Sequence, residues 1–154
     1  MDKDDPIGHL RKKWDGFSDT YEKFDAGPQA FYFSLVNMLK LGEARNFLEI
    51  GCGAGHLLNY AISSKRKESQ YVATDLSPEM VAKAETKVRK QLDLYRSPLT
   101  TKEFLEENKV ILKACDGEEP VDGYGLFDRV VCNLVLMLTN DPKKMLRSIH
   151  KVCT

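Results

Sequence analysis

Short apolar runs alternate with longer amphipathic segments along most of the chain. The apolar runs, which are typical of buried strands, lie at residues 47–50, 71–74, 109–114 and 127–136. The segments that repeat apolar residues every three or four positions, as amphipathic helices do, lie at 56–62, 77–92 and 141–152. Strands that alternate with helices favour right-handed crossovers and a parallel sheet. The pattern therefore predicts an α/β domain with ligands at the carboxyl ends of the strands.

Capping residues sharpen the positions of three helices. Ser77 and Asp141 are good N-cap residues, and each precedes a proline that fits the first helical turn. Thr100 and Glu103 have the spacing of a capping box, which predicts a short inserted helix within 96–108.

Two further helices are expected before the first strand. One lies between Leu10 and Phe24, where aromatic residues recur at helical spacing, namely Trp14, Phe17, Tyr21 and Phe24. The other begins at Pro28 and ends before Gly42. We expect one domain over 1–154, with an amino-terminal helical region at 10–42 and an α/β core at 46–152.

The composition indicates a soluble globular protein with balanced charge. Of the 154 residues, 42% are hydrophobic and 30% are charged, and 23 basic residues match 23 acidic ones. A balanced chain has no overall basic field to attract nucleic acid or an anionic membrane. The four cysteines form no C-x-x-C pair and the three histidines lie far apart, so no metal site or disulfide framework is indicated. No apolar run approaches membrane-spanning length, and we expect a reducing compartment, most simply the cytoplasm.

A glycine-rich turn at 51–55, Gly-Cys-Gly-Ala-Gly, follows the first strand and carries the candidate chemistry. Its glycines can adopt backbone angles that are closed to other residues, so a ligand can approach the main chain closely. Glu49 precedes the turn, and Asp75 ends the next strand, where a carboxylate can accept hydrogen bonds from two ribose hydroxyls. A dinucleotide fingerprint needs a small residue at the position of His56, so NAD is the weaker interpretation. His56 itself is interpreted as a surface or cap residue.

With these features the chain resembles class I S-adenosylmethionine-dependent methyltransferases, most specifically at 47–55, 71–80 and 114–117. The resemblance implies S-adenosylmethionine as the cofactor and methyl transfer to an unidentified small-molecule acceptor. It also implies a Rossmann-like parallel sheet with helices on both faces and strand order 3-2-1-4. The residues expected to bind the cofactor are Tyr21, Glu49, Gly51, Cys52, Gly53, Gly55, Asp75, Leu76, Met80, Asp116, Gly117 and Asn133.

The resemblance also gives these residues roles, and each role has an ordinary structural alternative. Asp116 would accept a hydrogen bond from the adenine amino group, although Asp-Gly is also a common turn pair. Leu76 and Met80 would cover the adenine ring, although a helical methionine is more often a core residue. Asn133 would line the sulfonium region. Tyr21 would lie in a helix that covers the cofactor, although the aromatic stripe is more often only packed against the domain.

Domains of this family continue through three more strands, so the fold is expected to be truncated after the fourth strand and its helix. This leaves an alternative function, that of a noncatalytic or partner-completed subunit. The apolar fourth strand would have an edge without charges or proline, which predicts self-association or a partner chain there. No catalytic residue is indicated. Residues 133–136 lack the Asn-Pro-Pro-Tyr type of signature, so methylation of nucleic acid is not supported.

Overall fold

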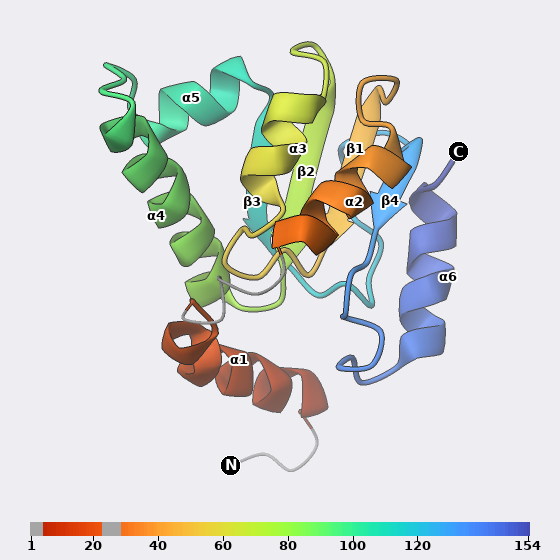
Figure 1. The fold of residues 1–154 in the computed structure, drawn as a ribbon. Coiled ribbons are helices and arrows are strands. Elements are labelled where there is room, and N and C mark those ends of the chain that lie inside the picture. The colour runs from red at the N-terminus through yellow and green to blue at the C-terminus, as the bar shows by residue number, and fades with distance from the viewer. Residues whose placement is uncertain (1–4, 23–28) are drawn as a thin grey trace.

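Four parallel strands form one sheet in this computed structural model, which describes residues 5–22 and 29–154 (Figure 1). The strands are β1 (Asn46–Ile50), β2 (Gln70–Asp75), β3 (Val110–Ala114) and β4 (Arg129–Val131). Their order in the sheet is β3-β2-β1-β4, which confirms the predicted order. Phe47 of β1 pairs with Tyr71 of β2, and Leu48 pairs with Val130 of β4.

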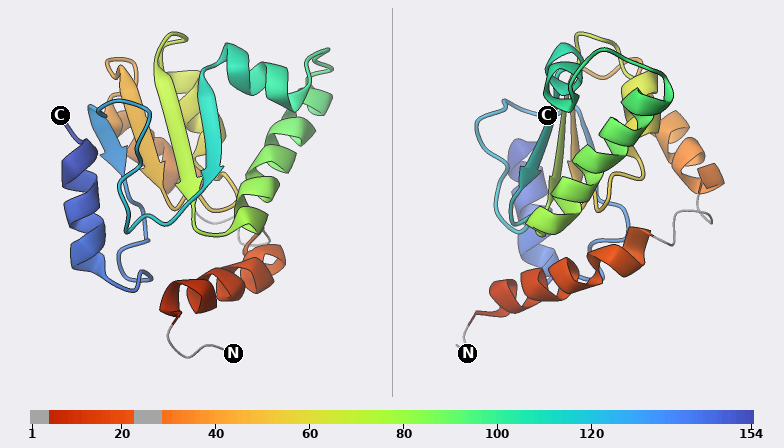
Figure 2. Two further views of the ribbon diagram at one scale, coloured as in Figure 1. Left: turned by 180° about the vertical axis from the view of Figure 1, so that it is seen from behind. Right: turned by 90° about the vertical axis from the view of Figure 1, so that its left-hand side faces the viewer.

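The described residues form six helices around this sheet, and helices cover both of its faces. They are α1 (Pro6–Glu22), α2 (Gln29–Leu39), α3 (Leu58–Ser64), α4 (Pro78–Leu94), α5 (Thr101–Glu107) and α6 (Pro142–Val152). Helices α2, α3 and α4 share one apolar core with the sheet, and α6 packs in a second core on the opposite face. Helix α1 crosses the carboxyl ends of the strands, as the two views in Figure 2 show. No described helix is long and apolar enough to cross a membrane.

The predicted capping residues occupy their expected positions. The Ser77 hydroxyl accepts a hydrogen bond from Met80 N at the start of α4 (3.1 Å), and Asp141 accepts one from Lys144 N at the start of α6 (2.9 Å). Thr100 and Glu103 form the expected capping box of α5. These caps confirm the starts of three helices; Pro28, the expected start of α2, lies outside the described residues.

The fourth strand is much shorter than the sequence indicates. A strand was expected over 127–136, but β4 contains only Arg129–Val131. The chain leaves the sheet because Leu134 adopts a left-handed backbone conformation (φ +58°) and Leu138 N donates to Val135 O in a turn (2.8 Å). Residues 132–139 therefore form a loop at the carboxyl end of the sheet.

His56 is buried, so its interpretation as a surface or cap residue was wrong. Its ring stacks on Tyr32 with the ring centres 5.9 Å apart, and its Nδ1 lies 3.2 Å from Lys87 Nζ. Helix α3 begins two residues later, at Leu58. The residue after the glycine turn is thus enclosed between α2 and α4.

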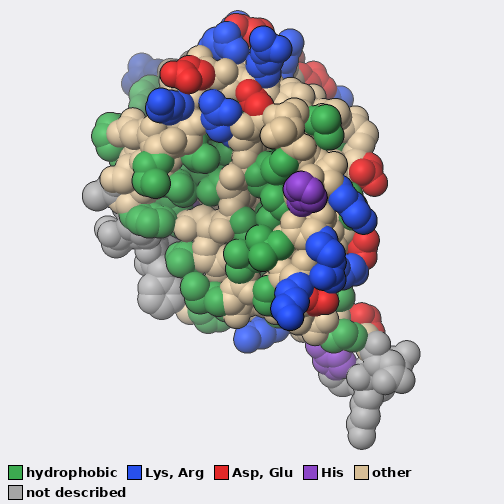
Figure 3. Space-filling model, turned by 90° about the vertical axis from the view of Figure 1, so that its right-hand side faces the viewer, with side chains coloured by type: hydrophobic (Ala, Val, Ile, Leu, Met, Phe, Trp, Pro, Cys, Tyr) green, Lys and Arg blue, Asp and Glu red, His purple; other side chains and the backbone are tan. Residues whose placement is uncertain are grey.

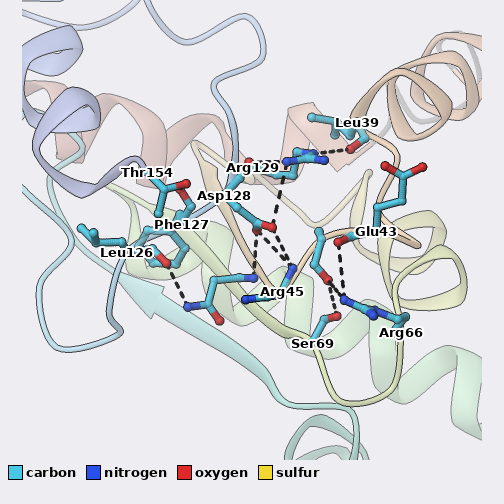
Figure 4. A network of polar contacts seen from close by, with 12 residues as sticks. Leu39, Glu43, Arg45, Arg66, Ser69, Leu126, Phe127, Asp128, Arg129 and Thr154 are labelled. Carbon is cyan, nitrogen blue, oxygen red and sulfur yellow. Dashed lines mark hydrogen bonds and ion pairs between the residues drawn. The ribbon is translucent and has the colours of Figure 1, made fainter.

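A polar network lies at the amino ends of β1 and β4 (Figure 4). This is the opposite end of the sheet from α1. The Asp128 carboxylate accepts hydrogen bonds from Arg45 N and Asn46 N, both at 3.0 Å. Arg129 Nε donates to Leu39 O at 3.0 Å, and Arg66 donates to the Glu43 carbonyl. These bonds satisfy backbone groups where the chain enters the strands, so we interpret the network as structural and not as part of a binding site.

Candidate functional site

A cavity of about 290 Å³ opens at the carboxyl ends of the strands, beneath α1. It lies where parallel α/β sheets bind their ligands. Its walls come from α1, the glycine turn, the ends of β2 and β3, and the loop at 132–139. The described lining residues are Leu10, Trp14, Ile50, Gly51, Gly53, Asp75, Leu76, Met80, Cys115, Asp116, Gly117, Glu118, Asn133, Leu134, Val135, Met137, Leu138, Thr139 and Met145.

The Asp75 carboxylate fastens the glycine turn to the start of α4. Its Oδ2 accepts from Gly53 N (2.8 Å) and its Oδ1 accepts from Ser77 N (2.9 Å). Gly53 has φ +53°, a conformation that glycine adopts without steric cost. Burial raises the pKa of Asp75, and these two hydrogen bonds oppose that shift. The carboxylate has further lone pairs for a ligand, because two oxygens offer about four acceptor sites.

Two glycines allow the loops around the cavity to come into contact. A Cβ on Gly51 would clash with Val135 of the 132–139 loop, and a Cβ on Gly117 would lie 2.5 Å from Ile50 Cγ2. Gly51 also has φ +74°, so a side chain there is excluded for conformational reasons as well. A Cβ at either position would meet atoms of the protein itself. Both glycines therefore have a packing role, which the sequence did not reveal.

Glu49 lies beneath the turn and does not line the cavity. Its carboxylate is buried in the core and accepts a hydrogen bond from the Tyr71 hydroxyl. Burial raises the pKa of Glu49 to about 7; the Tyr71 hydrogen bond lowers it and the charge of Asp75 raises it. Cys52 is buried beside Glu49, and burial raises the pKa of its thiol well above the ordinary value, so this thiol is not a reactive thiolate.

Glu118 is a buried cavity residue that sequence reasoning missed. Its Oε1 accepts from the Thr139 hydroxyl (2.6 Å) and from Asp141 N (2.8 Å), and its own N–H donates to Asp116 Oδ1 (2.9 Å). One side chain thus joins the loop after β3 to the loop before α6. The only signal in the sequence is a pair of glutamates after Gly117, and such pairs are usually exposed.

Helix α1 is held over the cavity by polar contacts with α4 and with the two residues that precede it. Arg11 Nε donates to Leu76 O (3.2 Å), Asp15 accepts a hydrogen bond from the Ser77 hydroxyl, and Asp19 pairs with Lys83 Nζ (2.6 Å). Trp14 then faces the cavity, and its ring packs edge-on against Phe17 at 5.9 Å between centres.

The structure brings eight of the twelve expected ligand-binding residues into the cavity wall. They are Gly51, Gly53, Asp75, Leu76, Met80, Asp116, Gly117 and Asn133. Glu49, Cys52 and Gly55 are not in the lining: Glu49 lies beneath the turn, and Cys52 and Gly55 belong to the turn itself. Tyr21 lies in α1, but its side chain is outside the described part of the structure, as is Phe24. Among the described residues, no group of three or more histidine, cysteine or acidic side chains is arranged to hold a metal ion.

A glycine turn with an acidic residue at the end of the adjacent parallel strand defines a nucleoside-binding α/β domain. The family model described as "Methyltransferase domain" matches residues 48–154, and the chain belongs to this family. A curated relative, trans-aconitate 2-methyltransferase of Mycobacterium tuberculosis (strain ATCC 25177 / H37Ra), is 37% identical over 71 residues. That match covers 46% of this chain and 26% of the relative, so the chain spans only a part of the curated relatives that it matches.

Solved structures agree with this fold. A SAM-dependent methyltransferase from Aquifex aeolicus superimposes with a TM-score of 0.69 at 19% identity, over 89% of this chain and 67% of that chain. Magnesium protoporphyrin IX methyltransferase from Synechocystis PCC 6803, solved with bound SAM, gives a TM-score of 0.61 at 20% identity, over 82% and 55% of the two chains. At these identities the likeness shows the fold alone.

Proposed function

We propose that this chain binds S-adenosylmethionine in the cavity and transfers its methyl group to a small-molecule acceptor. The observation that carries the proposal is the convergence of Asp75, Asp116 and the glycine turn on one cavity at the carboxyl ends of the strands. Membership of the methyltransferase family supports the same conclusion.

The cavity residues fit the chemistry of this cofactor. Its ribose hydroxyls and adenine amino group are donors, and Asp75 and Asp116 supply carboxylate acceptors. Its adenine ring is apolar on both faces, and Leu76 and Met80 supply apolar walls. Gly53 presents bare backbone where the amino-acid end of the cofactor would pass. We propose these contacts of Asp75, Asp116, Leu76, Met80 and Gly53 with the cofactor.

The protein's contribution to the reaction is binding, orientation and exclusion of water. When bound, the cofactor supplies a methyl group on a positively charged sulfur, which becomes a neutral thioether as the acceptor's lone pair forms the new bond. Such a transfer needs mainly alignment of the reacting atoms, so a nucleophilic side chain is not required. Trp14 of α1 and the loop at 132–139 both line the cavity, and we propose that they limit the access of water to it.

The second candidate is a noncatalytic or partner-completed subunit of the same family. It is favoured by the exposed apolar side chains of Leu126, just before β4, and Leu146 on α6. We place the protein in the cytoplasm under either proposal, which agrees with the free thiols of Cys52, Cys115, Cys132 and Cys153.

Calorimetric titration of the purified chain with S-adenosylmethionine, S-adenosylhomocysteine and NAD tests the proposal. We expect saturable binding of the first two and none of NAD. Binding of NAD alone would replace the proposal with an oxidoreductase. A folded chain that binds none of the three, with its fold checked by circular dichroism, would favour the noncatalytic subunit.

A further inference from the structure

The opening of the cavity carries apolar side chains from two separate segments. Leu10 and Trp14 come from α1, and Leu134, Met137 and Leu138 come from the loop at 132–139. Met137 is 74% exposed, Leu134 is 55% exposed and Leu138 is 41% exposed. Large apolar side chains that gather in the exposed wall of a cavity mark a place where something apolar binds.

The loop is held in place in a way that keeps these side chains exposed. Leu134 has φ +58°, a left-handed backbone conformation that non-glycine residues rarely adopt. Val135, the next residue, packs directly against Gly51. The Thr139 hydroxyl at the other end donates to Glu118 Oε1 (2.6 Å). A strained residue between two anchors is a common feature of binding sites.

Charge distinguishes the inner wall of the cavity from its opening. The inner wall carries the carboxylates of Asp75, Asp116 and Glu118, whereas the described lining includes no lysine, arginine or histidine. The described residues place two cations beside this wall: Arg11, whose Nε donates to Leu76 O, and Lys144, whose charge interacts with those of Asp116 and Glu118. Within a partly enclosed cavity, three carboxylates repel an anionic molecule more strongly than they would in water.

We propose that the methyl acceptor is a small apolar molecule without negative charge, whose apolar body lies between Trp14 of α1 and Met137 of the loop. This inference rests on the proposed function, because it names the substrate class of the same cavity. It also separates this chain from a tricarboxylate acceptor such as the one in the name of its curated relative.

Three probes with one skeleton and different charges test the inference. They are 2-naphthylethanol, 2-naphthylethylamine and the carboxylate anion of 2-naphthaleneacetic acid (the acetate). Each is titrated by calorimetry into the protein saturated with S-adenosylhomocysteine. We expect the alcohol and the amine to bind at least tenfold more tightly than the acetate. Equal or tighter binding of the acetate, or no binding of any probe, would overturn the inference.

Variants locate the bound probe. Met137→Ser should weaken binding of 2-naphthylethanol at least fivefold, and by more than it weakens binding of S-adenosylhomocysteine. The matched control is Met38→Ser, because Met38 is 80% exposed but lies on α2, outside the cavity. Equal effects of the two substitutions would place the probe elsewhere. If S-adenosylhomocysteine itself fails to bind, the proposed function fails, and the probes and variants then test the apolar site alone.

Discussion

We propose that Asp75 binds the ligand in addition to the structural role that its hydrogen bonds show. Its carboxylate holds the turn through Gly53 N and Ser77 N, and it lines the cavity where a ribose would lie. Asparagine keeps the size and one acceptor oxygen, so it retains one of the two bonds to Gly53 N and Ser77 N, whereas alanine removes both.

We predict that Asp75→Asn weakens binding of S-adenosylmethionine by about 1.5 to 3 kcal/mol, the range for hydrogen bonds to charged groups. This corresponds to roughly a 10- to 100-fold increase in Kd, measured by calorimetry. Asp122→Asn is the control, since Asp122 is exposed and outside the cavity. An unchanged Kd in a folded Asp75→Asn variant would remove Asp75 from the ligand contacts.

Glu49 links the stability of the fold to pH. Its pKa is raised from 4.5 to about 7, first by burial, so the folded state keeps the proton over a range in which the unfolded chain has released it. Stability is therefore highest below pH 4.5 for this group and is lost as pH rises to about 7. The full difference is about 3 to 4 kcal/mol, because one pKa unit corresponds to about 1.4 kcal/mol.

We predict that Glu49→Gln removes this pH dependence. Urea unfolding should show the wild-type chain losing stability between pH 5 and pH 8, and the variant losing markedly less. Glutamine still offers an oxygen to the Tyr71 hydroxyl, so the hydrogen bond is retained. Glu107→Gln, at an exposed position of α5, should follow the wild-type curve. Parallel curves for wild type and Glu49→Gln would contradict the raised pKa.

The loops at the carboxyl end of the sheet depend on Glu118, because it joins β3 to α6. Its Oε1 is the acceptor for both the Thr139 hydroxyl and Asp141 N, and Asp141 is also the N-cap of α6. Removing this carboxylate leaves two partly buried donors without their partner, which is more costly than the loss of a surface ion pair.

We predict that Glu118→Ala lowers the free energy of unfolding by about 1 to 3 kcal/mol, measured by urea denaturation. Glu118→Gln keeps one acceptor oxygen and should cost less. Glu119→Ala is the matched control: its carboxylate pairs with Lys144 at an exposed site, and such pairs contribute up to about 1 kcal/mol. Equal losses for Glu118→Ala and Glu119→Ala would show that Glu118 does not join the two loops.

The elements that the sequence predicted correctly are those governed by neighbouring residues. Ser77 and Thr100 cap their helices as expected, because a cap is made by residues within three positions of one another. The predicted length of β4 was wrong because apolar residues also suit a loop that packs on Gly51. Only the tertiary structure supplies that contact. The interpretation of His56 as a surface or cap residue was wrong for the same reason, since α2 and α4 enclose it.

The candidate site divides in a similar way. Asp75 and Asp116 were predictable because strand ends of a parallel sheet meet at one edge. Glu118 was not, because its role depends on Thr139, which lies on a separate loop. The apolar opening was also missed, because Leu134 was assigned to a strand over 127–136, whereas the backbone turns away from the sheet at this residue.

The side of the molecule that contains β4 and α6 carries several groups of hydrophobic side chains. Figure 3 shows hydrophobic side chains gathered over much of the side that contains β4 and α6, with basic groups toward its borders. Leu126, just before β4, is 54% exposed, and Leu146 on α6 is 52% exposed. The backbone at Phe127 is already paired, because its N–H donates to Val152 O (2.7 Å) and its carbonyl accepts from Thr154 N (3.0 Å). No described strand pairs with the outer side of Arg129–Val131.

We predict that the chain self-associates through this face, because a second copy covers both the apolar side chains and the unpaired strand edge. Sedimentation velocity should show a concentration-dependent dimer or larger species. Leu126→Lys and Leu146→Lys should each shift it toward the monomer, whereas Leu94→Lys should not, since Leu94 is 76% exposed at the end of α4, across the molecule. A monomer at high concentration, with the β4 amides protected from hydrogen exchange, would show that the edge is stable without a partner.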